Sequence, residues 1–164
     1  MEFTLYYSAL LALLALVSIR GSSPERTIVW VIFLADTADN FYHRIYGPSN
    51  FVHIDYTHLV IDGIAFAIVL WTALGANRFW PLPVCSLHLI GLTGHLAVMA
   101  GIPGMNQIYW AMLTVPDYIQ LPIILIGVLM HDRRIQRIGP YRDWRKDWRV
   151  PDFLRHPETA RAEA

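Results

Sequence analysis

Apolar residues dominate five stretches of the chain, and polar residues with turn-forming chemistry separate these stretches. A helix needs about 20 mostly apolar residues to cross a bilayer, with a range of roughly 17–25. The five stretches meet or nearly meet this length, so the pattern predicts an all-α, polytopic integral membrane helical bundle with five transmembrane helices. They comprise residues 3–19, 27–43, 57–75, 81–100 and 109–130, the last interrupted by Pro116 and Pro122.

The composition agrees with a membrane protein and limits its chemistry. Of the 164 residues, 55% are hydrophobic and 13% are aromatic, which is more than a soluble domain of this size usually contains. The single cysteine, Cys85, excludes an internal disulfide and a cysteine-cluster metal site. The one charged residue before the first apolar stretch is Glu2. A signal peptide would have basic residues there. We therefore interpret this stretch as a retained helix; without it, four spans remain.

The basic residues predict how the helices are oriented. Nine of the thirteen Lys and Arg residues follow Met130. If the C-terminus is cytoplasmic, five spans place the N-terminus outside, and Arg44 is then the one basic residue of the thirteen on the outer side. This asymmetry obeys the positive-inside rule. The sequence thus predicts a multi-pass protein of the inner (plasma) membrane, with a transmembrane bundle in residues 1–130 and a cytoplasmic tail in residues 131–164.

The predicted tail combines arginines with aromatic residues. Trp144 and Trp148 are four residues apart and would share one face of a helix. Such a pattern is typical of an interfacial helix that lies on anionic lipid headgroups. Three aspartates dilute the positive charge of the same segment, which favours a membrane surface over nucleic acid as the partner.

Ionisable residues interrupt four of the apolar stretches at a similar depth. Because a helix rises 1.5 Å per residue, Asp39, Asp62 and His95 lie about 6–7 Å below the predicted outer boundary, and Asp36 and Asp117 about 10–12 Å below it. Within each helix the spacing places these residues on one stripe. An isolated charge in the bilayer costs at least a few kcal/mol, so we expect an Asp/His pocket in the outer half of the bundle.

The pocket residues are candidate metal ligands. His58 and Asp62 are four residues apart and offer a nitrogen and an oxygen on one helical face. A mixed imidazole and carboxylate shell suits a divalent ion such as zinc, iron or manganese. The alternative is that the same groups form hydrogen bonds that only hold the helices together. The predicted ligand set is Asp36, Asp39, His43, His58, Asp62, His95 and Asp117.

A b-type haem is the other candidate cofactor. His88 and His95 lie on one helical face, about 10 Å apart along the axis, so each would need a partner on another helix. Gly91 and Gly94 on the same stretch would let a flat macrocycle approach the backbone. They would equally allow another helix to pack closely.

The pattern leaves more than one function open. Chains of Asp and His in membranes serve as proton or cation relays, and acid–His pairs act as general acids and bases or activate metal-bound water. The sequence therefore predicts a pocket that binds a cation, a metal or a small ligand, in transport or in membrane-embedded catalysis. The alternative is a non-catalytic accessory subunit of a larger membrane complex, associated with haem or a pigment, whose polar cluster only fixes helix packing.

Overall fold

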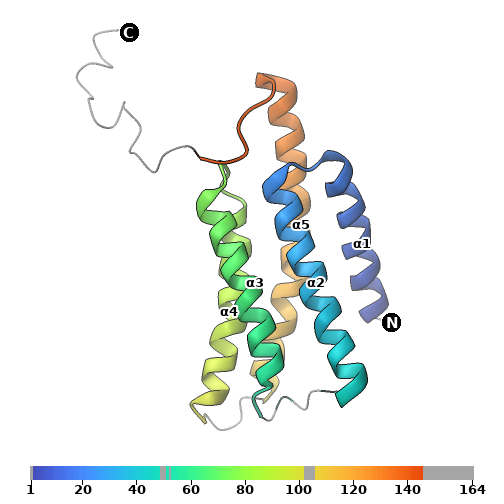
Figure 1. The fold of residues 1–164 in the computed structure, drawn as a ribbon, viewed down its shortest axis with the longest axis vertical. Coiled ribbons are helices and arrows are strands. Elements are labelled where there is room, and N and C mark those ends of the chain that lie inside the picture. Colours follow the sequence, from blue (N-terminus) through green and yellow to red (C-terminus); the bar gives the residue numbers. More distant parts are fainter. Residues whose placement is uncertain (1, 49–50, 52, 102–105, 146–164) are drawn as a thin grey trace, which may run out of the picture.

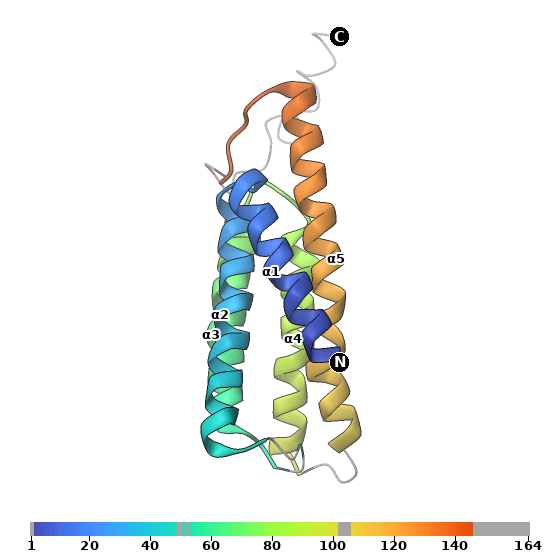
Figure 2. The same ribbon diagram turned by 90° about the vertical axis from the view of Figure 1, so that its right-hand side faces the viewer.

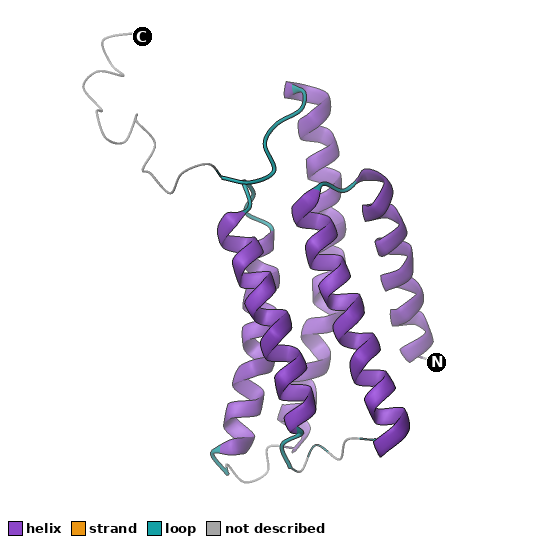
Figure 3. Cartoon of the chain, viewed as in Figure 1, coloured by secondary structure: helices purple, strands orange, loops and turns teal. Residues whose placement is uncertain are grey.

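The computed structural model describes residues 2–48, 51, 53–101 and 106–145, and this part of the chain is helical throughout apart from its connections (Figures 1 and 3). The helices are α1 (Glu2–Arg20), α2 (Ser23–Tyr46), α3 (Tyr56–Gly75), α4 (Pro81–Met99) and α5 (Asn106–Ile138). All five predicted segments are therefore helices, and the described residues contain no strand. The prediction of an all-α protein is confirmed to this extent.

Three of the helices are long and apolar enough to cross a membrane: α3, α4 and α5. The apolar part of α1 that the structure describes, Leu5–Arg20, is shorter. Five of the 24 residues of α2 are charged, including Asp36 and Asp39. The structure is thus that of a helical protein whose membrane-like spans run from α3 onward.

The two prolines of the last segment do not interrupt it. Pro116 and Pro122 lie inside the continuous helix α5, whereas the sequence pattern predicted a break there. A proline removes one backbone donor and crowds the preceding turn. In membrane-spanning helices this is tolerated because neighbouring groups satisfy the freed carbonyls.

Helices α2 to α5 form an antiparallel bundle, and α1 packs against both α2 and α5 (Figures 1 and 2). We call the end where α2 meets the loop to α3 the His43 end, and the opposite end, where α3 meets the loop to α4, the Arg78 end. The N-terminus of α1 stops well short of the His43 end (Figure 2). Consequently α1 covers the Arg78 end and the middle of the bundle, where Tyr6 and Tyr7 reach Asp36 and Asn40 of α2, and leaves the His43 end uncovered.

The half of the bundle next to the Arg78 end is a closely packed apolar core. Its fully buried side chains come from every helix and are mainly aliphatic: Leu10, Val17, Ile28, Val29, Val69, Val84, Ile124 and Val128. The ring of Trp80 fits against Gly127, where a Cβ atom would lie only 2.6 Å from the ring. Dense packing of this kind leaves no room for an added methyl group.

A buried ion pair closes the Arg78 end. Glu25 is 0% exposed and pairs with Arg78, which is 7% exposed. Glu25 also accepts hydrogen bonds from Ser22 in a capping box at the start of α2, and one from the Trp80 indole at 3.3 Å. The second Arg78 nitrogen donates to Asp143 at 2.8 Å. These contacts join the start of α2, the loop before α4 and the segment after α5.

The segment after α5 is not the helix that the sequence pattern predicted, as far as it is described. Residues 139–145 are not helical and fold back onto the end of α3, where the Arg145 amide donates to the Gly75 carbonyl at 2.8 Å. The Trp144 ring packs on Trp71, with centroids 5.1 Å apart. The backbone pairing and this ring contact take the place of helical hydrogen bonds. The rest of the predicted interfacial helix, including Trp148, lies outside the described residues.

We expect Gly127→Ala to lower the free energy of unfolding by about 1–3 kcal/mol, because its methyl group collides with the Trp80 ring. Gly63→Ala in α3 is the control, since a Cβ there meets nothing within 4 Å and the substitution adds about 0.5–1 kcal/mol of helix stability. Denaturant titration of both variants in detergent measures the effects. Equal stabilities would contradict the packing described here.

We expect Arg78→Ala to lower the free energy of unfolding by about 3–5 kcal/mol, because it leaves the Glu25 carboxylate buried without its cation. The matched control is Arg20→Ala. Arg20 also faces an acid, Asp132, at 3.5 Å, but its side chain is 59% exposed, so the loss is about 0–1 kcal/mol. The same titration compares the two, and a mild effect at Arg78 would show that the pair does not hold this end together.

Candidate metal centre

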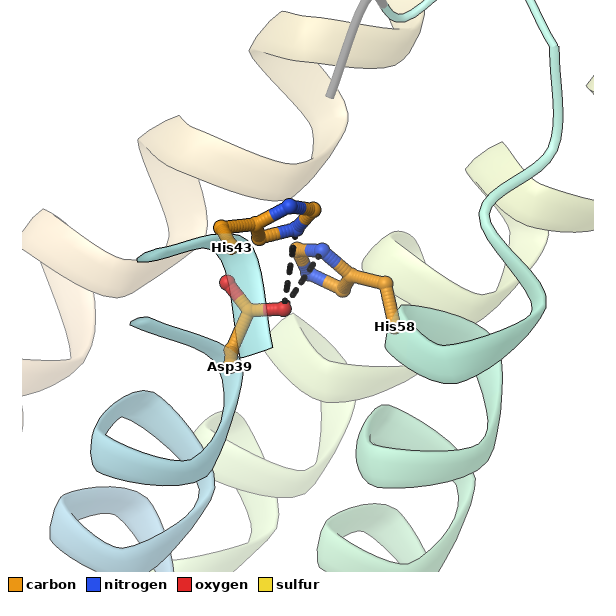
Figure 4. A group of neighbouring side chains, drawn as sticks. All are labelled: Asp39, His43 and His58. Carbon is orange, nitrogen blue, oxygen red and sulfur yellow. Dashed lines mark ion pairs between the residues drawn. The ribbon is translucent and has the colours of Figure 1, made fainter. Parts of the chain in front are cut away.

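Three side chains meet at the His43 end of the bundle, where α2 and α3 lie side by side (Figure 4). Asp39 and His43 come from one turn of α2, and His58 from the first turn of α3. Asp39 Oδ1 lies 3.4 Å from His43 Nε2 and 3.2 Å from His58 Nδ1. We call these three residues the His43 group.

The His43 ring is held with one nitrogen facing inward. Its Nδ1 lies 2.8 Å from the Gly47 carbonyl oxygen, so Nδ1 carries the proton and donates it. Gly47 has a φ of 97° and ends α2, a conformation that glycine adopts without strain. Nε2 therefore faces Asp39. Asp39 Oδ1 and His43 Nε2 are both buried and have no hydrogen-bond partner.

Asp55 adds a further carboxylate to this group. Its Oδ1 caps α3 by accepting hydrogen bonds from the Thr57 and His58 amides at 3.0 and 3.2 Å. Its Oδ2 lies 3.5 Å from His43 Nε2. Asp55 is not among the site residues predicted from the sequence. The available signal was an acid directly before the third apolar stretch, in the position of a helix cap.

A second group of three shares His58 with the first. His58 Nε2 lies 3.5 Å from Asp62 Oδ2, and His95 Nε2 lies 3.0 Å from the same oxygen. His95 is fully buried, and its Nδ1 lies 2.7 Å from the Tyr109 hydroxyl. We call His58, Asp62 and His95 the His95 group. Tyr109 was predicted only as the start of the fifth span, and no sequence signal links it to His95.

Both groups have the chemistry and the spacing of a metal site. Ligands about 2.0–2.1 Å from a tetrahedral zinc ion lie about 3.3 Å from one another. Within each group the ligand atoms all lie within 4.8 Å of one another, and the four close distances are 3.0–3.5 Å. Three of these exceed the 2.7–2.9 Å of a charge-assisted hydrogen bond by about 0.3 Å or more. The residues present therefore fit a divalent ion.

A chamber of about 320 Å³ adjoins the two groups on their inner side. Asp39, His58 and Asp62 line its end nearest the groups, and helix α1 contributes Tyr6 and Tyr7. The lining contains four aspartates and neither Lys nor Arg. The chamber ends at Gln120, beyond which the apolar core fills the bundle.

The two deepest predicted ligands belong to the chamber and lie outside both groups. Asp36 Oδ2 accepts a hydrogen bond from the Tyr6 hydroxyl at 2.6 Å, and Asp117 Oδ1 accepts one from Gln120 at 3.2 Å. Of the seven predicted ligands, the structure thus brings five together and places Asp36 and Asp117 farther along the chamber wall. It includes neither in a three-residue ligand group among the described residues.

The contacts of the helix α4 histidines give no support to a haem site. His95 does not line the chamber, and its ring nitrogens face Asp62 and Tyr109 rather than a space that could hold a macrocycle. His88 lines the chamber, and its Nε2 is buried without a hydrogen-bond partner. Gly94 allows close packing, because a Cβ there would lie 3.2 Å from Met112 and 3.4 Å from Tyr109.

Comparison with protein-family models, curated proteins and solved structures finds no significant match to this chain. The functional argument therefore depends on the geometry of the site itself.

We expect Tyr109→Phe to lower the free energy of unfolding by about 1–3 kcal/mol, because it removes the only hydroxyl that meets the buried His95 Nδ1 in the described structure. Tyr118→Phe is the control, since Tyr118 is 42% exposed and a surface substitution changes stability by about 0.5 kcal/mol or less. Denaturant titration compares the two variants. An unchanged Tyr109→Phe protein would mean that the hydroxyl does not hold the imidazole.

Proposed function

We propose that this protein is a multi-pass membrane protein that binds a divalent transition-metal ion at the His43 group and presents it to the chamber for catalysis on a small substrate. One observation carries the proposal. Asp39 Oδ1 and His43 Nε2 face each other 3.4 Å apart, buried, with no hydrogen-bond partner, while Gly47 fixes the His43 ring. When His43 is neutral, its Nε2 lone pair faces the Asp39 carboxylate, and a metal cation between the two atoms would turn this unfavourable contact into two metal–ligand bonds.

The proposed membrane arrangement has five spans, with the N-terminus outside and the C-terminus cytoplasmic. The three apolar helices support it, as does the concentration of basic residues after Met130. The Arg78 end then faces the cytoplasm, and the His43 end lies in the outer half of an inner (plasma) membrane. The residues after α5, rich in arginine, would contact anionic headgroups.

The ligand arrangement suits a catalytic ion. Asp39, His43 and His58 supply three protein ligands, and catalytic zinc sites keep a fourth position for water or substrate. Asp39 and His58 also line the chamber, so the free position would face space that a substrate can enter. There the ion would activate water or polarise a carbonyl or phosphoryl oxygen. Asp55 is the residue that could occupy the fourth position at rest.

Transport is the second candidate, and the apolar core argues against it. A cation that crosses the bundle needs a polar path at both ends of the chamber. Beyond Gln120 the core is mainly aliphatic, and the Glu25–Arg78 pair closes the Arg78 end. The chamber is therefore a blind pocket, which suits a substrate that enters and leaves on the same side.

Protein purified in detergent after expression with added zinc should contain tightly bound metal by elemental analysis. His43→Ala should lower this content to near zero, because it removes one of three ligands, whereas His131→Gln, which alters a buried histidine at the Arg78 end, should retain it. Cobalt-substituted protein should show the visible bands of tetrahedral Co²⁺, and azide should shift them by entering the free position. Wild-type protein that binds neither zinc nor cobalt would refute the proposed function.

A further inference from the structure

The geometry points to a dinuclear metal centre, in which His58 bridges one ion in the His43 group and a second ion in the His95 group. This inference rests on the proposed function, since it adds a second ion to the site described above. It defines the centre as one imidazolate between two divalent ions, each with its own aspartate and its own histidine. Such a centre positions two cations at the chamber end where a substrate would bind.

The first argument is the position of the His58 ring. Its Nδ1 lies 3.2 Å from Asp39, and its Nε2 lies 3.5 Å from Asp62. Each nitrogen thus faces the carboxylate of a different ligand group. Both distances are close to the separation of about 3.3 Å between neighbouring ligands of one tetrahedral ion.

The second argument is that the two terminal histidines are held in the same way. His43 directs Nε2 at Asp39 while Nδ1 meets the Gly47 carbonyl at 2.8 Å. His95 directs Nε2 at Asp62 while Nδ1 meets the Tyr109 hydroxyl at 2.7 Å. A metal-bound imidazole almost always has such a partner on its other nitrogen. The His95 group therefore has its own supporting contact, as the His43 group does.

A single-ion centre would use Asp62 differently. In that arrangement Asp62 would accept the His58 Nε2–H and orient the ring, as carboxylates commonly do behind a metal-bound histidine. The hydrogen bond would then be about 2.7–2.9 Å long, whereas the distance is 3.5 Å. Moreover, His58 Nε2 and His95 Nε2 both face the same Asp62 oxygen. These two nitrogens and this oxygen are the three ligand atoms of the second ion.

The third argument is charge. Asp39, Asp55 and Asp62 together with a bridging imidazolate carry four negative charges, which two divalent ions neutralise. Asp36 and Asp117 have separate hydrogen-bond donors in Tyr6 and Gln120. The chamber lining holds neither Lys nor Arg that could supply the positive charge instead. Binding of the second ion releases the remaining ring proton of His58 to solvent, so the charges balance.

Metal stoichiometry tests this inference. Wild-type protein saturated with zinc and desalted should hold about two ions per chain, and His95→Ala or Asp62→Asn about one, because each removes a ligand of the second ion only. His58→Ala should lose both ions. His88→Gln is the control, since His88 lines the chamber but belongs to neither group, and it should keep both. Size-exclusion elution identifies any variant that fails to fold. If His95→Ala is such a variant, His95→Gln replaces it.

Copper-loaded wild-type protein provides a measurement that needs no variant. Two Cu²⁺ ions joined by an imidazolate couple antiferromagnetically, so the integrated paramagnetic resonance signal at low temperature should fall well below the total copper. His95→Ala should restore a signal equal to its copper content. One ion per chain in the wild type, unchanged by His95→Ala, would overturn the dinuclear centre and leave the single-ion function standing. Two ions with a full, uncoupled signal would overturn the bridge, and no ion at all would refute the proposed function itself.

Discussion

Partly buried carboxylates without a lysine or arginine beside them are the constraint on which this bundle depends. Four aspartates line the chamber, and none of its other lining residues is a Lys or an Arg. A charged carboxylate among apolar helices is costly unless hydrogen bonds or a cation compensate it. Hydroxyl and amide donors serve Asp36 and Asp117, and imidazoles surround Asp39 and Asp62. The register of α2 against α3 and α4 is therefore the one that brings histidines to these acids.

The two ends of the bundle compensate their acidic residues by different means. The difference indicates that one end has a structural role and that the other can bind a metal ion. At the Arg78 end, a guanidinium pairs with Glu25. Arginine is always charged and has no lone pair for a metal, so this pair can only hold the helices and the segment after α5 together. At the His43 end, the partners are imidazoles, which offer a lone pair when they are neutral. Among the described residues, the groups of three His and Asp residues that could exchange protons for a metal ion lie at that end.

Local sequence patterns predicted the helices and the depth of the polar residues in the bundle, because periodicity and rise per residue are properties of a single helix. They could not predict how neighbouring helices are rotated, and that rotation decides which ring nitrogen of His58 faces which carboxylate. Asp55 and Tyr109 escaped prediction for the same reason, since each acts on a histidine from another helix. The pairing of Glu25 with Arg78, 53 residues apart in sequence, was equally invisible, because it joins two parts of the chain, unlike the capping box that Glu25 forms with the nearby Ser22.

A purely structural role for the cluster would require its hydrogen bonds to be satisfied, and this decides between packing and metal binding. Leaving one buried donor or acceptor without a hydrogen bond costs about 1–3 kcal/mol, and here neither Asp39 Oδ1 nor His43 Nε2 makes one. Adding a proton to His43 would form an imidazolium that faces Asp39 at 3.4 Å and Asp55 at 3.5 Å. Both distances are longer than the 2.7–2.9 Å of a charge-assisted hydrogen bond. They match the spacing of ligands around a metal ion, and a metal ion therefore accounts for the geometry better than a proton does.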